Sequence, residues 1–278
     1  MNPFTIHIAN ALSLNPHQVE ATLKLLDEGC TIPFIARYRK ERTGNLDEVQ
    51  IAKISEQNTQ LKELEKRKVT VIKAISEQNK LTADLEKRIK GCWSPVELED
   101  LYLPYKTKRR TRAQVAREQG LEPLATLILL QRDEHPEQAA RRFVKGDVTD
   151  VKAAITGAKD IIAEMVSENE QSRNTVRAAY RREAIISSKV IKKMADTDEA
   201  QKFTDYFDCS EPLRRCSSHR LLAMRRGQEA GVLRVTIGIE GEDMMETKLC
   251  HQFVKGRGTC QDLVAEAVVD AYKRLISP

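Results

Sequence analysis

The stretch "DEVQIAKISEQNTQLKELEKRKVTVIKAISEQN", residues 47–79, contains neither proline nor glycine. Its apolar side chains recur at roughly heptad spacing, with Glu and Lys in the gaps; they are Ile54, Leu61, Leu64, Val71, Ile72 and Ile75. An apolar stripe of this period predicts one long amphipathic helix. The stripe is short for a coiled coil and lapses at Lys68, so the pattern favours packing within a domain.

Short helices are expected on both sides of this long helix. The first covers about 3–13, and Asn15-Pro16 supplies the cap and first turn of a second helix that stops at Gly29. A short helix starts near Pro33. Beyond the long helix, Thr82 and Ser94-Pro95 each open another one. Compact helices with short connections predict a helix-turn-helix-like subdomain at about 65–125.

The remaining chain is expected to be helical up to about residue 200 and mixed beyond it. Helices are predicted at about 111–119, 122–131, 136–144, 149–167, 170–183 and 184–195. Residues 205–227 suggest two capped helical turns, 245–254 are ambiguous between strand and helix, and 259–276 form an amphipathic helix. The alternation at 232–238 is the best strand signal. The predicted fold is therefore mainly α, a helical region at 1–200 and a mixed segment at 201–278, with at most a small β element near 232–238.

Composition supports a helix-rich protein. Charged residues make up 31% of the 278 residues and aromatics 5%, with only 12 glycines, which fits poorly with a β-sandwich. The start lacks the basic segment of a signal peptide, and no apolar run approaches a membrane span. The six cysteines show no CxxC spacing, which argues against structural zinc and predicts reduced thiols in a cytoplasmic protein.

The positive charge is concentrated in one stretch, "YLPYKTKRRTRAQVAREQG", residues 102–120. It holds six cations and one carboxylate, and the net charge of the whole chain is +5. The candidate nucleic-acid-binding residues are Lys106, Lys108, Arg109, Arg110 and Arg112, which can track phosphates in a salt-dependent way. The alternative is a structural loop whose cations cap helices and pair with the acids at 97–100. Tyr102 and Tyr105 can stack on bases or anchor the loop in a core.

Two further basic clusters are weaker candidates. The first contains Arg37, Arg39, Lys40 and Arg42, offset by Glu41 and Asp47. The second contains Arg214, Arg215, Arg220, Arg225 and Arg226, for which contact with a further domain is an equal alternative.

Catalytic signals are weak, and the chain is expected to be no enzyme, with no metal and no cofactor. Ser217, Ser218 and His219 are neighbours in sequence, which is not the geometry of a triad. The "KGRGTC" stretch at 255–260 lacks the pattern of a nucleotide loop. Asp205 and Asp208 are too isolated to indicate a metal pair.

Three long segments carry a family resemblance. They are "LDEGCTIPFIARYRKERTGNLDEVQI" at 26–51, "DLYLPYKTKRRTRAQVAREQGLEPLA" at 100–125 and "DYFDCSEPLRRCSSHRLLAMRRGQEAGVLRV" at 205–235. They resemble the N-terminal region of the bacterial Tex proteins, the transcription accessory proteins. Cys30, Cys209 and Cys216 stand where other residues are expected in many members.

The resemblance implies a multidomain nucleic-acid-binding factor linked to transcription and similar to a eukaryotic transcription elongation factor. It implies a helical N-terminal region with a helix-turn-helix-like part, followed by an RNase H-like domain, helix-hairpin-helix elements and an S1 RNA-binding domain. The chain is thus expected to be an N-terminal piece of a longer protein. The aromatic platform of an S1 domain has no counterpart in its sequence.

Two hypotheses of function follow. The first is a non-enzymatic scaffold region that contributes a basic surface to sequence-independent binding of RNA or DNA. The second is a protein-interaction platform that docks the other domains of its own full-length chain, or RNA polymerase and other transcription machinery, without touching nucleic acid. Neither involves a membrane. The salt dependence of binding affinity distinguishes the two hypotheses, because phosphate contacts weaken steeply as ionic strength rises.

Overall fold

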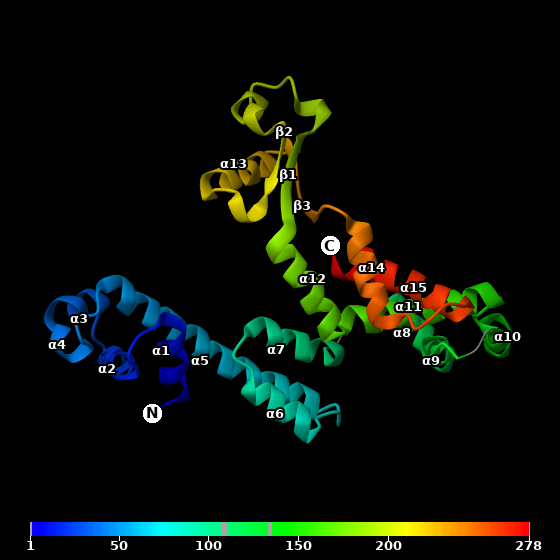
Figure 1. Cartoon of the computed structure of the whole chain (residues 1–278), viewed down its shortest axis with the longest axis horizontal. Coiled ribbons are helices and arrows are strands. Elements are labelled where there is room, and N and C mark those ends of the chain that lie inside the picture. Colours follow the sequence, from blue (N-terminus) through cyan, green and yellow to red (C-terminus); the bar gives the residue numbers. More distant parts are fainter. Residues whose placement is uncertain (1, 107–109, 133–134, 278) are drawn as a thin grey trace. The chain divides into compact units, whose positions relative to one another are not determined.

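The structure, a computed structural model, describes residues 2–106, 110–132 and 135–277. Helices make up most of these residues, so the prediction of a mainly α fold is confirmed (Figure 1). The chain divides into two compact units, Met1–Lys106 (unit 1) and Thr107–Pro278 (unit 2). This boundary differs from the predicted division into 1–200 and 201–278, which stays a prediction.

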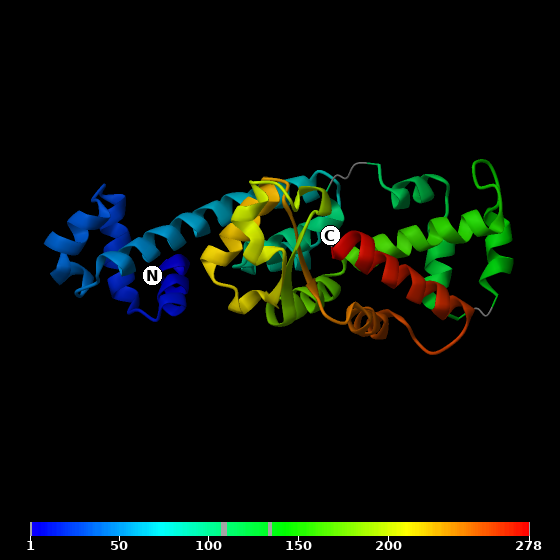
Figure 2. The same cartoon turned by 90° about the horizontal axis from the view of Figure 1, so that it is seen from above.

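Unit 1 consists of helices alone among its described residues. The long helix α5 runs beside the shorter ones, with α1–α4 gathered around one end of it (Figures 1 and 2). The bounds are α1 Pro3–Leu12, α2 Pro16–Asp27, α3 Ile32–Tyr38, α4 Lys40–Thr43, α5 Glu48–Ser76, α6 Ala83–Gly91, α7 Pro95–Tyr102 and the 3₁₀ turn η1 Leu103–Tyr105.

Local capping explains where these helices begin. Asn15 and Gln18 form a reciprocal capping box at α2, and Asp47 forms another with Gln50 at α5. The Thr82 and Ser94 side chains accept backbone N–H groups at the starts of α6 and α7. The predicted starts of these helices are therefore confirmed.

The apolar stripe of α5 packs inside unit 1, as predicted. Ile51, Ile54 and Ile75 are fully buried in its core. Lys68, where the stripe lapses, is also buried, with 2% of its surface exposed. Its Nζ donates to Glu65 Oε1 at 2.7 Å and to the Lys90 carbonyl at 3.0 Å, and lies 5.2 Å from the ring centroid of Trp93. These contacts compensate the buried ammonium group.

Unit 2 combines a helical body with a small antiparallel sheet of strand order β2-β1-β3. Its helices are α8 Arg112–Glu118, α9 Glu122–Leu130, α10 Pro136–Ala140, α11 Val151–Glu168, α12 Glu170–Glu183, α13 Ser218–Glu229, α14 Glu242–Phe253 and α15 Thr259–Ala271. The strands are β1 Ala184–Val190, β2 Asp208–Pro212 and β3 Leu233–Ile239. Single turns are η2 Arg141–Phe143, η3 Lys192–Met194, η4 Ala200–Tyr206, η5 Leu213–Arg215 and η6 Tyr272–Ile276.

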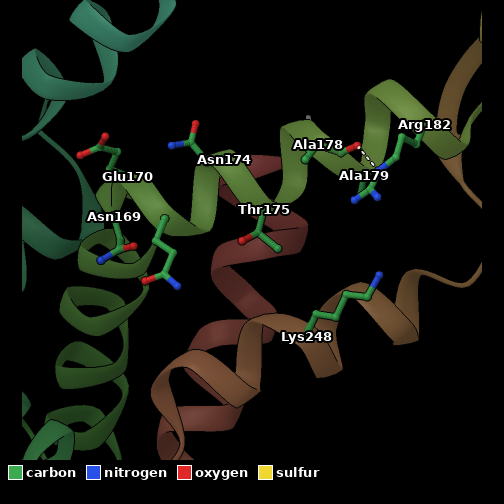
Figure 3. A pocket seen from close by; sticks show the side chains of 9 residues that line it. Asn169, Glu170, Asn174, Thr175, Ala178, Ala179, Arg182 and Lys248 are labelled. Atoms are coloured by element: carbon green, nitrogen blue, oxygen red, sulfur yellow. Dashed lines mark hydrogen bonds between the residues drawn. The ribbon is translucent and has the colours of Figure 1, made fainter.

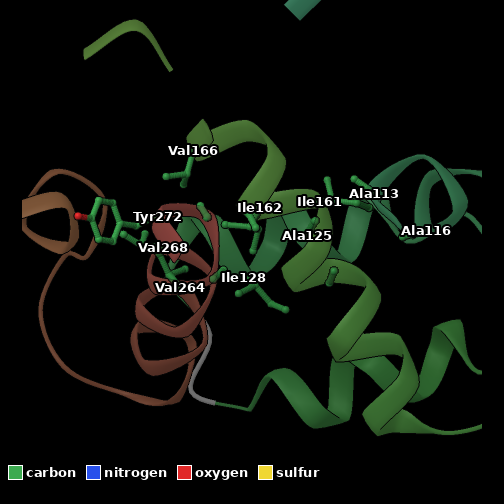
Figure 4. Packing of buried hydrophobic residues seen from close by; sticks show 14 of the residues in the cluster. Ala113, Ala116, Ala125, Ile128, Ile161, Ile162, Val166, Val264, Val268 and Tyr272 are labelled. Atoms are coloured by element: carbon green, nitrogen blue, oxygen red, sulfur yellow. The ribbon is translucent and has the colours of Figure 1, made fainter. Parts of the chain in front are cut away.

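The main core of unit 2 lies around α11, which packs against α8, α9 and α15. Ile161 and Ile162 of α11 meet Ala125 and Ile128 of α9 and Val264 of α15 in this core (Figure 4). A Cβ at Gly157 would lie 2.4 Å from Leu121 Cδ1, so the glycine permits this close helix packing.

Two sequence predictions for unit 2 were wrong. Residues 184–195 were expected to be helical, but 184–190 form β1 between the other two strands. Residues 208–212 were expected within helical turns but form β2. In β1, Ala184, Ile186 and Ser188 are buried, and this alternation of period two suits a strand that covers a core. The predicted strand at 232–238 is confirmed as β3.

The remaining expectations concern thiols and membranes. All six cysteines are free thiols, and burial raises the pKa of Cys92, Cys216 and Cys250. Among the helices that the structure describes, none combines the length and the apolar character of a membrane span.

Candidate nucleic-acid interface

The basic stretch starts from a firmly packed end of unit 1. Tyr102 and Tyr105 are half-buried and pack against the core of this unit. Gln78 Nε2 donates to the Tyr105 carbonyl at 2.8 Å, which ties η1 to the end of α5. The guanidinium of Arg67 lies 5.4 Å from the ring centroid of Tyr102. Of the two roles considered for the tyrosines, the contacts support anchoring in a core.

The candidate site residues lie on both sides of the boundary between the units. Lys106 is exposed at the end of unit 1, and Arg110 and Arg112 are exposed at the start of unit 2. Lys108 and Arg109 lie outside the described residues. Arg110 Nη2 donates to Glu118 Oε2 at 2.9 Å, while 71% of its side chain is exposed. An exposed ion pair contributes only about 0–1 kcal/mol, so a phosphate can compete with Glu118 for Arg110.

Arg117, the last cation of the stretch, has a structural role. Its Nη1 donates to Glu164 Oε2 at 2.5 Å, and Thr111 Oγ1 donates to Glu164 Oε1 at 3.0 Å. Thr111 also caps α8 by accepting the Gln114 N–H. Glu164 therefore fixes the start and the body of α8 against α11. Lys106 and Arg110 precede this attachment, and Arg112 lies between its two contacts.

Arg112 lies in the field of a partly buried carboxyl group. Burial raises the pKa of Asp160, while the charges of Arg274 and Arg112 oppose that rise. Arg274 Nη2 donates to Asp160 Oδ1 at 3.1 Å, and Arg112 is exposed at the start of α8.

The acids at 97–100 were the alternative partners of the stretch. Glu99 accepts two hydrogen bonds from Arg67 of α5, at 2.7 and 3.2 Å, and this contact raises the pKa of Arg67. Asp100 is buried. Pairing of these acids with Lys108 or Arg109 stays a prediction.

The two weaker basic clusters differ in how their cations are used. In the first, Arg37, Arg39, Lys40 and Arg42 are all exposed on or beside α3 and α4. In the second, Arg220 Nη1 pairs with Glu211 Oε2 at 3.1 Å and fixes α13 to β2. The other four members of that cluster, Arg214, Arg215, Arg225 and Arg226, are exposed.

In the described part of the chain, the catalytic and metal candidates are not arranged as a catalytic triad or as a metal site. Ser217 Oγ lies 3.3 Å from His219 Nε2 at the exposed start of α13, and no acidic partner of His219 is found there. No group of three His, Cys, Asp or Glu among these residues is placed to hold a metal ion.

A polar groove of about 740 Å³ on unit 2 was not indicated by the sequence. It lies along α12 and includes Lys248 of α14, which extends toward α12 from the facing helix (Figure 3). Arg182 lies near one end, and its Nε donates to the Ala178 carbonyl at 3.3 Å. Residues 245–254 were ambiguous between strand and helix, and the structure has them helical up to Phe253, within α14.

Two family descriptions match parts of this chain. "Tex-like protein N-terminal domain" matches residues 2–76, and "Tex central region-like" matches 131–270, about half of the chain. The first lies within unit 1 and the second within unit 2. The basic stretch at 102–120 lies between them.

Several curated proteins are similar to the chain. It is 43% identical over 236 residues to "Transcriptional accessory protein Tex" of Neisseria gonorrhoeae, covering 85% of the chain and 31% of that protein. It is 42% identical over 242 residues to "Protein tex" of Bordetella pertussis, covering 86% and 30%. It is 27% identical over 287 residues to the human "S1 RNA-binding domain-containing protein 1", covering 98% and 28%. The chain thus spans about a third of the length of these relatives.

Proposed function

The chain belongs to the Tex family, and from this membership we propose that it is a non-enzymatic, nucleic-acid-binding scaffold region of a transcription accessory protein. The bound partner is the phosphate backbone of RNA or DNA, and binding is independent of sequence. The contacts come from Lys106, Lys108, Arg109, Arg110 and Arg112. The names of the relatives support this proposal, since one is a transcriptional accessory protein and another carries an S1 RNA-binding domain.

One observation carries the proposal. The described cations Lys106, Arg110 and Arg112 are exposed, although fixed residues adjoin them: Gln78 binds the Tyr105 carbonyl, and Glu164 binds Thr111 and Arg117. Contacts to phosphates require a positive charge on a long side chain and no recognition of bases. Lysine and arginine side chains meet these requirements.

Docking of a protein is the second candidate function, and it is favoured by α13. Leu222 of this helix is 56% exposed, and Arg225 and Arg226 are exposed on the same helix. Arginine is enriched in protein contact surfaces, and Leu222 adds exposed apolar area beside Arg225 and Arg226. This surface suits a further domain of the full-length protein or a component of the transcription machinery.

Changing Lys108, Arg109 and Arg110 together to Ala is expected to weaken binding to mixed-sequence oligonucleotides about equally for all sequences. Loss of three phosphate contacts should flatten the slope of log K against log salt by about 2–3 units. Fluorescence anisotropy across a salt series measures both effects. Folding should change little, because exposed ion pairs contribute about 0–1 kcal/mol each.

A matched control removes the same charge elsewhere. Lys53, Lys66 and Lys73 are exposed on α5, and their joint change to Ala should keep the slope of the unchanged chain. Equal slopes for the two triple variants would mean that the salt dependence of binding follows the net charge of the chain alone. That result would contradict the proposed site. Unfolding of the first variant, with unchanged binding per folded molecule, would support the structural alternative.

A further inference from the structure

Two aromatic rings on unit 1 are exposed although an apolar core lies directly behind them. Tyr38 is 67% exposed and Phe34 is 37% exposed, while Ile35 and Ala36 on the same helix α3 are buried. Phe34 and Tyr38 are four residues apart, so they share one face of the helix. Their ring centroids lie 5.4 Å apart, with 44° between the ring planes.

Cations surround these rings. The guanidinium of Arg39 lies 5.1 Å from the ring centroid of Phe34, which is a cation–π contact. Arg37, Lys40 and Arg42 are exposed in the same short segment, and Glu41 is the one acid within 37–42. Arg42 has only a long contact of 3.9 Å to Glu28, with both side chains about half exposed. We call Phe34, Arg37, Tyr38, Arg39, Lys40 and Arg42 the aromatic–basic patch.

We propose that the aromatic–basic patch binds single-stranded nucleic acid, with bases stacked on Tyr38 and Phe34 and phosphates on the neighbouring cations. This inference rests on the proposed function and adds a second contact site to it. Base–aromatic stacking tolerates any sequence, because every base has a π face. The excess of positive charge is complementary to a polyanion and disfavours a basic partner.

The exposed rings select the form of the nucleic acid. In a duplex the faces of each base are covered by the neighbouring base pairs, so a ring cannot stack on them without opening the helix. A single strand offers its base faces freely. Exposed cations alone would bind both forms, so the two rings are the feature that favours a single strand.

The patch is separate from the basic stretch within unit 1. It lies near the start of α5, while α7 and η1, which lead into the basic stretch, lie near the other end of that helix (Figure 1). A helix of 29 residues is about 44 Å long. Each site can therefore be changed without touching the other.

Changing Tyr38 to Ala in the full chain tests the stacking. Affinity for a mixed-sequence single strand of about 16 nucleotides should fall about 5- to 100-fold. Tyr38→Phe keeps the ring and should stay within about twofold of the unchanged chain. The same strand with its bases removed keeps the phosphates but offers nothing to stack on. On this abasic strand, Tyr38→Ala should bind like the unchanged chain.

Other outcomes would overturn the inference in distinguishable ways. If the chain binds with a steep salt dependence and Tyr38→Ala loses nothing, the patch fails and the proposed function stands; the rings then face a protein partner. If Tyr38→Ala weakens binding to intact and abasic strands equally, the ring acts without stacking. If the unchanged chain binds no nucleic acid at low salt, both proposals fail. Tyr38 is largely exposed, so its loss should leave folding unchanged, which circular dichroism checks.

Discussion

Replacing Glu164 with Ala is expected to lower the free energy of unfolding of unit 2 by about 1.5–3 kcal/mol. Its carboxylate is 9% exposed and accepts hydrogen bonds from Arg117 Nη1 at 2.5 Å and Thr111 Oγ1 at 3.0 Å. Arg117 is 27% exposed, so water can solvate its charge after the change, and the cost is the loss of these charge-assisted hydrogen bonds. Urea denaturation followed by circular dichroism measures the loss.

A second ion pair on α11 provides the control. Lys159 Nζ lies 2.8 Å from Glu266 Oε2, and the Glu266 side chain is 61% exposed. Glu266→Ala should therefore cost about 0–1 kcal/mol. Trp93, the one tryptophan of the chain, lies in unit 1, so its fluorescence reports that unit separately. Equal costs for the two Glu variants would contradict the structural role assigned to Glu164.

Replacing Leu124 with Ala is expected to destabilise unit 2 by about 2–5 kcal/mol. Leu124 of α9 is fully buried in the core around α11, and truncating it removes apolar contacts and leaves a cavity. Leu130 on the same helix is 56% exposed, so Leu130→Ala should change stability by no more than about 0.5 kcal/mol.

The two leucine variants are compared in the same urea experiment. Because both changes are Leu to Ala in one helix, differences in helix propensity cancel. A large loss for Leu130→Ala, or none for Leu124→Ala, would mean that α9 buries another face than the one described. The packing of α9 on α11 would then be wrong.

Local signals in the sequence were enough to predict most helices. The absence of Gly and Pro over 47–79, together with the apolar stripe, defined α5 to within a few residues. The caps at Asn15, Thr82 and Ser94 did the same for α2, α6 and α7. These signals are local because a cap involves residues at most three positions apart.

The missed strands depend on partners far along the chain. Residues 184–190 follow a helix without a strong break, and their pairing is with 208–212 and 233–239. Pairing over that distance leaves only a weak local trace, the alternation from Ala184 to Ser188. The buried Lys68 was also invisible, because the Lys90 carbonyl that it contacts lies 22 residues away.

In the candidate site, too, contacts between residues far apart in the chain could not be predicted from local signals. Residues 102–120 contain six similar cations, and no local signal distinguishes those with a structural role from those that are exposed. The structure distinguishes Arg117, bound by Glu164 47 residues later, from the exposed Arg110 and Arg112. The use of the exposed cations by a phosphate backbone stays a prediction, as does the helix-turn-helix-like interpretation of 65–125.

The central claim is that this chain binds nucleic acid through phosphate contacts, and the salt dependence of its affinity tests it most directly. The measurement is the binding of the unchanged chain to mixed-sequence single-stranded and duplex oligonucleotides across a salt series. The five contacts of the basic stretch predict that log K falls linearly with log salt, with a slope of about −3.5 for a single strand and about −4.5 for a duplex. These slopes are the smallest expected in magnitude, because phosphate contacts at the aromatic–basic patch would make them steeper. An affinity that does not change with salt, or no binding at the lowest salt, would contradict the claim and favour a protein-docking role.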